Sequence, residues 1–478
     1  MRHMETASRE QDISDAVDRL LSPNRPSFRR PPDPSVLKAL AETEEAAAPV
    51  VPKEFRVETD AAMSRIVLVV PRHGGPDASA LRCAIEARPE EAASSARAAA
   101  PPAITAIDAA RWTARAGPKG ADCEALVEVL AWDDLADAAM PTAIRHGLRA
   151  TVRTVWTYLS TGALVRLWHL RRGAVMAAGS RLLPFAAEVV VALGVGLVSG
   201  RLLAGGLAPL LSSVDLPNWP GVLVASFAGA SAAFLVLRNL RRNDGRIGAY
   251  APMRGLAYLS SGRGAYPPAL EERLVSFSER IGWALRQRVR EVVVVGQGDG
   301  AALAVSALVE AVRWGELPDG APAVSILTLG QSIPLIGFLP EAGRLRADLR
   351  DLSLRRDICW LDVSDPADLH AFALCDPVAV CGVAQDDRKG PLVLASSCGR
   401  FRGRDALSLW RQNGLRLRDR YLEPMGDEGR DYDWMRVILG RLPMRKFLGG
   451  RPPASGRIDI RGSAYINTSR PPPEPEDD

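Results

Sequence analysis

The sequence predicts an α/β fold in which a doubly wound, mostly parallel sheet is interrupted by two apolar helices. Short β-branched runs alternate with helical segments in both halves of the chain, which is the pattern of a wound parallel sheet. Two long apolar segments separate these halves. Of the 478 residues, 47% are hydrophobic and 24% are charged, a composition typical of a globular protein with a substantial core.

The chain begins with an arm for which we expect no stable fold. Residues 1–62 are rich in Pro, Glu and Ala, which predicts disorder with one or two short helices. Their start is charged and has no apolar run, so we expect no cleaved secretory signal. Residues 63–142 form the first part of the α/β domain. There RIVLVV at 65–70 and LVEVLAW at 126–132 predict strands, and the turn PRHGGP follows the first.

Residues 143–181 are basic and carry aromatic side chains. They contain seven arginines and no Asp or Glu, with Trp156 and Trp168 among aliphatic residues. Such a stretch suits the surface of a membrane, where arginines meet anionic lipid head groups. We therefore predict amphipathic interfacial helices, with a surface helix that binds an acidic partner domain as the alternative. The arginines are Arg145, Arg149, Arg153, Arg166, Arg171, Arg172 and Arg181.

Two apolar segments follow, and we interpret residues 182–242 as a transmembrane hairpin in a lipid bilayer. The segments 182–200 and 221–237 are almost free of charge. A spanning helix needs roughly 20 apolar residues. A Gly-x-x-x-Gly spacing that begins at Gly196 would let two such helices approach closely. The alternative is a buried helical hairpin in a soluble core.

The arginines around these segments predict their orientation. Basic residues precede the first segment and follow the second, whereas the only charged residues in the connection at 201–220 are Arg201 and Asp215. The positive-inside rule then places both termini in the cytoplasm. Glu188 lies near one end of the first segment, where it is either functional or simply solvated at the interface.

The second part of the α/β domain covers residues 243–448. Helical and strand patterns alternate there at the spacing of a parallel sheet. We expect helices at 268–290, 300–315 and near 340–352, and strands at 291–295, 323–329 and 357–363. Residues 449–478, which include GGRPPASG and RPPPEPEDD, are predicted to form a disordered tail.

Charge and cysteine usage exclude several classes of partner. The formal charge of +4 gives no reason to expect a nucleic-acid partner. Six cysteines are scattered without a CxxC pair or a Cys/His cluster, so we expect neither a disulfide framework nor a metal site. No cofactor is predicted.

A glycine turn at 296–300 separates the run VVVV from an alanine-rich helical segment. Strand, glycine turn and helix occur in the nucleophile elbow G-x-S-x-G, but here Gly298 stands where the serine belongs. The turn also matches a dinucleotide fingerprint through Gly296, Gly298 and Ala301, without the acid expected at the end of the next strand. A third interpretation makes the glycines purely structural, for close packing and a positive φ.

Motifs along the chain carry a resemblance to a known fold. They are RIVLVVPRHGG, RWTAR, EVLAWDD, VVVVGQGDGAALAV, SILTLGQSIPLIG, CWLDVSDPADLHAFALCDPV, NGLRLRDRY and DYDWM, with the apolar segments between the third and the fourth. On these motifs, residues 63–435 resemble the α/β-hydrolase fold. They resemble more closely a group of uncharacterised bacterial inner-membrane proteins in which a two-helix transmembrane hairpin interrupts the hydrolase domain. The resemblance implies a bacterial inner (cell) membrane location.

The resemblance also implies where a catalytic triad would lie, and two of its members are missing. Gly298 occupies the nucleophile position, Asp376 that of the acid, and Arg418 stands where relatives have the histidine base. In this fold the base follows the acid along the chain, and here no histidine follows Asp376. The five histidines are His3, His73, His146, His169 and His370. Without nucleophile and base, covalent and proton-transfer chemistry are lost, which predicts a pseudoenzyme.

A ligand site could remain in such a domain. His73, Gly74 and Gly75 after the first strand, with the backbone N–H of Asp299, correspond to the oxyanion hole of a working relative and could hold a carboxylate or carbonyl. Asp376 and Arg418 would pair and lock the empty site. The leading hypothesis is a binding or scaffolding module for an unidentified protein or small-molecule ligand.

Two other hypotheses stay open beside it. One is a membrane-anchored hydrolase of ester or lipid-like substrates with an unconventional nucleophile, for which Ser332 in LGQSIP is the best candidate. The other is a nucleotide-binding oxidoreductase that uses the Gly296/Gly298/Ala301 turn. The first predicts labelling by serine-reactive probes, and the second predicts a cofactor spectrum.

Overall fold

A computed structural model describes most of the chain from Ser64 onward. The described residues are 64–86, 103–116, 123–139, 144–180, 183–213, 219–242, 251–313, 317, 320–396, 420–423, 432–440 and 442–469. The predicted arm at 1–62 lies outside them, as does the end of the chain from residue 470.

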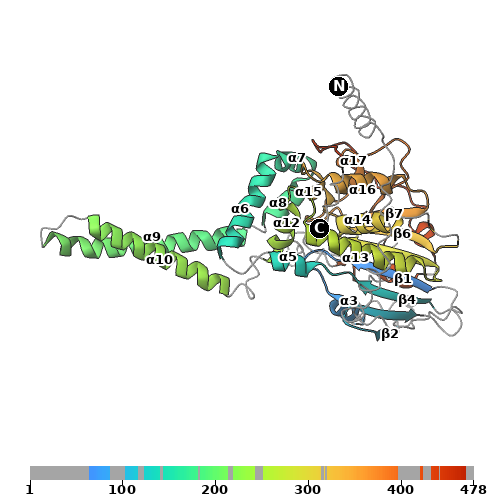
Figure 1. Ribbon diagram of the computed structural model, residues 1–478, viewed down its shortest axis with the longest axis horizontal. Helices are drawn as coiled ribbons and strands as arrows, with labels where there is room; N and C mark the ends of the chain where they lie inside the picture. Colours follow the sequence, from blue (N-terminus) through green and yellow to red (C-terminus); the bar gives the residue numbers. More distant parts are fainter. Residues whose placement is uncertain are drawn as a thin grey trace, which may run out of the picture. The chain divides into compact units, whose positions relative to one another are not determined.

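An eight-stranded mixed sheet forms the centre of the α/β domain in the described part of the chain (Figure 1). Its order is β2-β3-β4-β1-β5-β6-β7-β8, and the six strands from β4 to β8 in this order run parallel. The strands are β1 (Ser64–Val70), β2 (Ala103–Ala106), β3 (Arg111–Ala116), β4 (Cys123–Val129), β5 (Glu291–Gln297), β6 (Ala323–Leu329), β7 (Ile358–Ser364) and β8 (Leu392–Ala395). The prediction of an α/β protein with a mostly parallel sheet is therefore confirmed.

One edge of the sheet differs from the prediction. There β2 pairs antiparallel with β3, and β3 pairs antiparallel with β4. The sequence pattern does not predict β2, because AITA is short and mostly exposed and lacks the apolar run of a buried strand. The strand expected at 126–132 is β4, which begins and ends three residues earlier.

Helices cover both faces of the sheet (Figure 1). Ile66 and Leu68 of β1 face one apolar cluster, whereas Val67 and Val69 face the other, which is the alternation of a strand buried on both sides. The first cluster includes residues of α13 (Pro268–Leu285), α14 (Gly300–Arg313) and α16 (Gly343–Leu354). The second includes residues of α3 (Ala78–Glu86), α20 (Trp434–Leu439) and α21 (Met444–Phe447).

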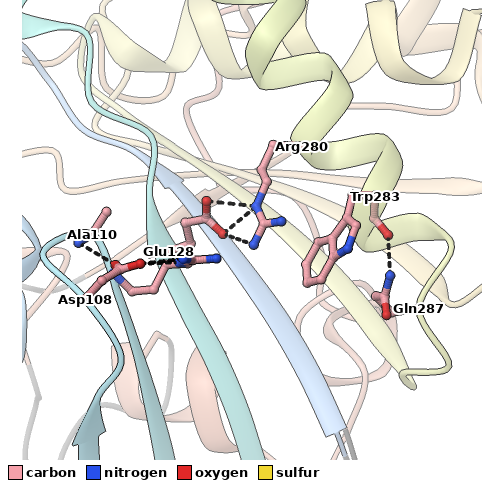
Figure 2. A network of polar contacts seen from close by, with 7 residues as sticks. Asp108, Ala110, Glu128, Arg280, Trp283 and Gln287 are labelled. Atoms are coloured by element: carbon pink, nitrogen blue, oxygen red, sulfur yellow. Dashed lines mark hydrogen bonds and ion pairs between the residues drawn. The ribbon is translucent and has the colours of Figure 1, made fainter. Parts of the chain in front are cut away.

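A charged pair joins the sheet to α13 (Figure 2). Arg280 of α13 points toward Glu128 of β4, with Nε 2.8 and 2.7 Å from the two carboxylate oxygens. Its guanidinium also lies over the ring of Trp283, 3.7 Å from the ring centre. The two charged side chains are only 16% and 11% exposed, so this pair fixes α13 against the sheet.

A second buried pair holds the C-terminal helices against the sheet. Arg65 of β1 lies 2.7 Å from Glu291 of β5, and the side chains are 5% and 1% exposed. Arg65 also donates to the carbonyl of Leu442 at 2.9 Å. The other Glu291 oxygen accepts from Ser325 Oγ at 2.8 Å and from the N–H of Met444 at 2.9 Å. Both charges are therefore paired and hydrogen-bonded, as buried charges require.

A run of helices lies between β4 and α13 in the sequence. These helices are α5 (Asp133–Ala139), α6 (Ile144–Ser160), α7 (Ala163–Leu170), α8 (Arg172–Ser180), α9 (Leu183–Ser212), α10 (Trp219–Arg242) and α12 (Ala251–Ser260). In this run α9 and α10 lie side by side (Figure 1). A Cβ on Gly196 would lie 2.6 Å from the carbonyl oxygen of Gly229, so glycine lets the two backbones approach closely.

Two of these helices are long and apolar enough to cross a membrane. The stretches are Val190–Pro209 in α9 and Trp219–Val236 in α10. Only 11% and 17% of their residues are buried, which argues against the buried hairpin of a soluble core. Helix α9 covers nearly all of the predicted segment 182–200, but it continues unbroken to Ser212 and so includes Arg201.

Residues 449–469, which were predicted to belong to a disordered tail, have a defined structure, and this corrects the prediction for them. Arg346 of α16 is fully buried and donates to the main-chain carbonyl of Asn467 at 2.8 Å and to its side chain. The carbonyl of Ile458 accepts from the N–H of Asp376 at 2.9 Å. A Pro- and Gly-rich composition misses this order because specific polar contacts, rather than a periodic apolar face, hold the segment.

Candidate functional site

The turn between β5 and α14 needs glycine at three positions. Gly298 has a φ of +58°, a conformation that favours glycine. A Cβ on Gly296 would lie 2.6 Å from the Cα of Ala301, and one on Gly300 would lie 2.3 Å from the carbonyl oxygen of Pro71. The flanking glycines therefore let the strand turn sharply into the helix, close to the end of β1.

No reactive side chain stands at the tip of this turn. Gly298 offers only its main chain, and a Cβ there would lie 3.0 Å from the Cβ of Arg72. Its N–H donates to the carbonyl of Leu329 at 3.0 Å, and its carbonyl accepts from the N–H of Ser332 at 3.0 Å. The tip is thus bound to the end of β6, and it supplies no nucleophile.

The turn after β1 uses its N–H groups within the chain. The N–H of His73 donates to the Asp299 carboxylate at 2.9 Å, and that of Gly74 to the Asp133 carboxylate at 3.3 Å. The N–H of Gly75 donates to the carbonyl of Arg72 at 2.8 Å. These donors were expected to hold a ligand. In the structure, two carboxylates and a carbonyl of the protein itself accept from these three N–H groups.

The side chain of His73 packs inside the fold, although the residue as a whole is half-buried. Its ring lies against Trp132, with 5.6 Å between ring centres, and its side chain is 6% exposed. It also packs on α12, where a Cβ on Gly255 would lie 2.4 Å from the His73 Cβ. The Nε2 atom is 3.8 Å from the carboxylate of Asp137. His73 therefore joins the turn to α5 and α12.

Carboxylates gather beside this histidine. Burial raises the pKa of Asp133, and the carboxylates of Asp299 and Asp137 raise it further, whereas His73 and the N–H of Gly74 lower it. A cluster of acids disfavours a second anion nearby. The turn is therefore poorly suited to a phosphate or carboxylate ligand.

Asp376, the predicted triad acid, caps a short helix and pairs with Arg388. Its Oδ1 accepts from two N–H groups in the first turn of α17 (Pro377–Val380), at 3.1 Å each. Its Oδ2 lies 2.9 Å from Nη1 of Arg388. Burial raises the pKa of Asp376, and Arg388 opposes the rise. Arg418 lies outside the described residues.

A narrow pocket lies where the carboxyl ends of β5, β6 and β7 meet. This edge of an open α/β sheet is where ligands usually bind. The cavity volume is about 20 Å³, which is room for a water molecule but not for an organic substrate. The described residues that line it are Arg72, Gln297, Gly298, Asp299, Leu329, Gly330, Ser332, Asp368, His370 and Tyr421.

Sequence reasoning does not predict Asp368, His370 or Tyr421 as residues of this pocket. Asp368 and His370 follow β7, so the meeting of parallel strand ends was a usable signal for them. Tyr421 comes much later in the chain, and no motif marks it. Asp368 accepts from the N–H of His370 at 2.8 Å and from the hydroxyl of Tyr421 at 3.2 Å, which holds the three residues together.

Ser332 shares the pocket with a histidine and a carboxylate, those of His370 and Asp368. It precedes α15 (Ile333–Gly337), but its side chain does not cap this helix. Ser332 as a whole is 7% exposed. A serine hydroxyl attacks only when a base activates it, so chemistry here would require His370 to accept its proton.

A buried acid in β7 is kept neutral. Asp362 is fully buried, and its Oδ1 accepts from Thr328 Oγ1 at 2.5 Å. Burial raises the pKa of Asp362 to about 8, although the hydrogen bond from Thr328 lowers it. Its second oxygen has no hydrogen-bond partner among the described residues. Asp362 is therefore mostly protonated at neutral pH and is no strong base.

No family model, curated protein or solved structure matches the chain. Within the described ranges, no three His, Cys, Asp or Glu side chains are grouped so that they could hold a metal ion. Function must therefore be inferred from the geometry of the turn, the pocket and the exposed helices.

Proposed function

We propose that this protein is anchored in the bacterial inner membrane and that its α/β-hydrolase-like domain has lost hydrolase chemistry and acts as a binding or scaffolding module. The turn at Gly298 carries the proposal. It has the flanking glycines and the positive φ suited to a nucleophile elbow, but it has no nucleophile, and Asp299 occupies the N–H of His73. Acyl transfer requires both an attacking group and free oxyanion donors.

The anchor in this proposal is α9–α10, inserted as a transmembrane hairpin. Both helices are long and apolar enough and leave most of their residues exposed. The basic segment 143–181 before them and Arg238 after them support cytoplasmic termini. Arg201 lies 18 residues after Leu183, the first residue of α9. It would therefore lie about 27 Å along the helix, where its long side chain can reach the far head groups.

Fluorophosphonate labelling of membranes that contain the full chain tests the loss of catalysis. We expect the native protein to show neither labelling nor turnover of short-chain esters. The variant Gly298→Ser/Arg418→His restores both missing triad members, and added Asp299→Ala frees the N–H of His73, so this triple variant should gain labelling. Gly320→Ser is the matched control, because Gly320 also has a positive φ (+80°) but nothing within 4 Å of its Cβ position. Labelling of the native protein would contradict the proposal.

Ser332 carries the second candidate function, a membrane-anchored hydrolase of ester or lipid-like substrates. One observation favours it, namely that Ser332 lines the same pocket as His370 and Asp368. If the native protein is labelled, the modified peptide should contain Ser332, and both Ser332→Ala and His370→Ala should abolish the label. Labelling that survives both substitutions would remove this candidate.

We do not extend the proposal to nucleotide binding at the same turn. The carboxylates of Asp299 and Asp133 lie beside it and would repel a pyrophosphate. The next strand, β6, ends at Leu329 and is followed by Gly330 and Gln331, without an acid to bind a ribose.

A further inference from the structure

The outer faces of α6, α7 and α8 expose large apolar side chains between arginines. On α6, Trp156 is 67% exposed, with Val152 and Leu159 beside it on the same side of the helix. The exposed large apolar residues of the three helices are Val152, Trp156, Leu159, Val165, Trp168 and Met176. The exposed arginines are Arg149, Arg153, Arg166 and Arg172. We call these ten residues the outer face.

The pattern on α6 is the reverse of that on an ordinary surface helix. Thr151, Thr154 and Thr157 are buried, at 7%, 5% and 6% exposed, whereas Val152 and Trp156 point outward. An amphipathic helix of a soluble protein buries its apolar side and exposes its polar side. A contiguous exposed apolar patch of this kind marks a surface that something else covers.

The charge of the outer face indicates an anionic partner. Residues 143–181 contain seven arginines and neither Asp nor Glu. None of the four arginines of the outer face pairs with an acid among the described residues. Their charges are therefore free to meet negative groups on a partner.

Continuity with α9 and α10 identifies that partner as lipid. Helix α8 ends at Ser180 and α9 begins at Leu183, and contacts join α8 to α9 and α6 to α10. The outer face therefore adjoins the apolar helix pair. Tryptophans beside arginines at the end of a membrane span are typical of the boundary between hydrocarbon and head groups.

We propose that the outer face of α6–α8 docks on the anionic surface of the bilayer that α9 and α10 span. The inference rests on the proposed function, because it requires that the helix pair is inserted. It extends the proposed function by naming what α6–α8 bind. Their partner is a lipid surface rich in phosphate head groups without compensating positive charge.

The inner side of the same helices holds the pocket loop. Arg171, between α7 and α8, donates to three main-chain carbonyls between residues 366 and 373, at 2.8 to 3.3 Å. The hydroxyl of Tyr158 donates to the carbonyl of Leu335 at 2.9 Å. The helices that dock on the bilayer are therefore the same ones that hold the loop with Asp368 and His370.

Quenching of tryptophan fluorescence by brominated lipids tests the proposal on the full chain in nanodiscs. Trp219 at the start of α10 reports insertion of the helix pair, whereas Trp156 and Trp168 report docking. With brominated phosphatidylglycerol, we expect Trp219→Phe to remove one part of the quenching and Trp156→Phe/Trp168→Phe to remove another. With brominated phosphatidylcholine, the part due to Trp156 and Trp168 should be at least about threefold smaller, because that lipid carries no net charge.

The arginines are tested by charge removal. In phosphatidylglycerol discs, Arg149→Gln/Arg153→Gln/Arg166→Gln should reduce the quenching of the outer-face tryptophans at least about threefold. A matched control removes three other exposed arginines, near the start of β5, and should change nothing. These are Arg286, Arg288 and Arg290, each replaced by Gln.

The outcomes separate this inference from the proposed function. Quenching of Trp219 without quenching of Trp156 and Trp168 would leave the anchor intact and overturn docking. Absence of quenching at all three would contradict the anchor itself. Equal quenching by the two lipids, or no effect of the arginine substitutions, would overturn an anionic surface as the partner.

Discussion

The turn at 296–300 and the outer face of α6–α8 differ in where their polar and apolar groups find partners. Around the turn, N–H groups of His73 and Gly74 are taken by carboxylates of the same chain, and glycines are packed against main-chain atoms. On the outer face, tryptophan and arginine side chains are left exposed. A region that satisfies its own groups has little to offer a ligand, whereas exposed apolar and charged groups require one.

The largest expected effect on stability is in the buried core, where charged groups are paired within the chain. Arg65→Met should lower the free energy of unfolding by about 3–5 kcal/mol, because it leaves the buried carboxylate of Glu291 without its cation. Denaturant unfolding of the detergent-solubilised chain, followed by fluorescence, measures this loss. Arg286→Met, at an exposed position, is the control and should have little effect. Similar small losses for both variants would mean that the pair contributes little.

A smaller loss is expected where the turn packs on the end of β1. Gly300→Ala should cost about 1–3 kcal/mol, because its Cβ would lie 2.3 Å from the carbonyl oxygen of Pro71 and the backbone must shift. Gly179→Ala in α8 is the matched helical control, with nothing within 4 Å of its Cβ position. Equal melting temperatures for the two variants would show that the turn does not pack tightly on the carbonyl of Pro71.

The buried acid of β7 predicts a pH dependence. The folded state keeps the Asp362 carboxyl protonated up to a pKa of about 8, whereas the unfolded chain releases that proton near the usual value of 3.8. This group therefore makes the native protein less stable as pH rises from about 4 to 8, by at most about 1.4 kcal/mol per pH unit. Asp362→Asn should gain stability relative to the native chain as pH rises through this range.

Melting temperatures at pH 5 and pH 8 check this sign. The difference between Asp362→Asn and the native protein should grow in favour of the variant at pH 8. Asp351→Asn, at a side chain that is 40% exposed, should show no such trend. A variant that loses relative stability at the higher pH would contradict a neutral Asp362.

The smallest expected effect is on the outer face. Trp156→Ser should change the free energy of unfolding by less than about 0.5 kcal/mol, because a side chain that is 67% exposed makes few contacts within the fold. Denaturant unfolding in detergent would measure it beside Trp434→Ser, where the ring is fully buried and the loss should be several-fold larger. A large loss for Trp156→Ser would mean that this face packs on protein.

Much of the fold could be predicted because the central strands are marked by local pattern. The run before Gly296 and the run AVSILTL are buried on both faces, so their β-branched residues stand out in the sequence. The edge strand β2 could not be predicted in this way, since its four residues are mostly exposed. The segment 449–469 was missed because isolated hydrogen bonds, such as that from Arg346 to Asn467, leave no periodic signal.

Less of the candidate site could be predicted, because it depends on contacts between distant segments. The sequence alone shows that Gly298 stands at the nucleophile position and has no reactive side chain. The hydrogen bond from His73 to Asp299, in contrast, joins residues 226 apart. Among the described residues Asp376 pairs with Arg388, and nothing in the motif around either residue indicates that pair. The outer face was better marked, because seven arginines without an acid form a local signal.

In our interpretation, this protein binds its partner through the outer face and not through the turn. The most direct test is hydrogen–deuterium exchange of the full chain, compared between phosphatidylglycerol and phosphatidylcholine nanodiscs. Peptides that cover residues 149–176 should exchange more slowly in phosphatidylglycerol, because the anionic surface covers them. Peptides at 71–75 and 296–301 should exchange equally in both lipids, since the N–H groups of His73, Gly74 and Gly298 donate within the chain. Equal exchange over 149–176 in the two lipids would contradict this view of the protein.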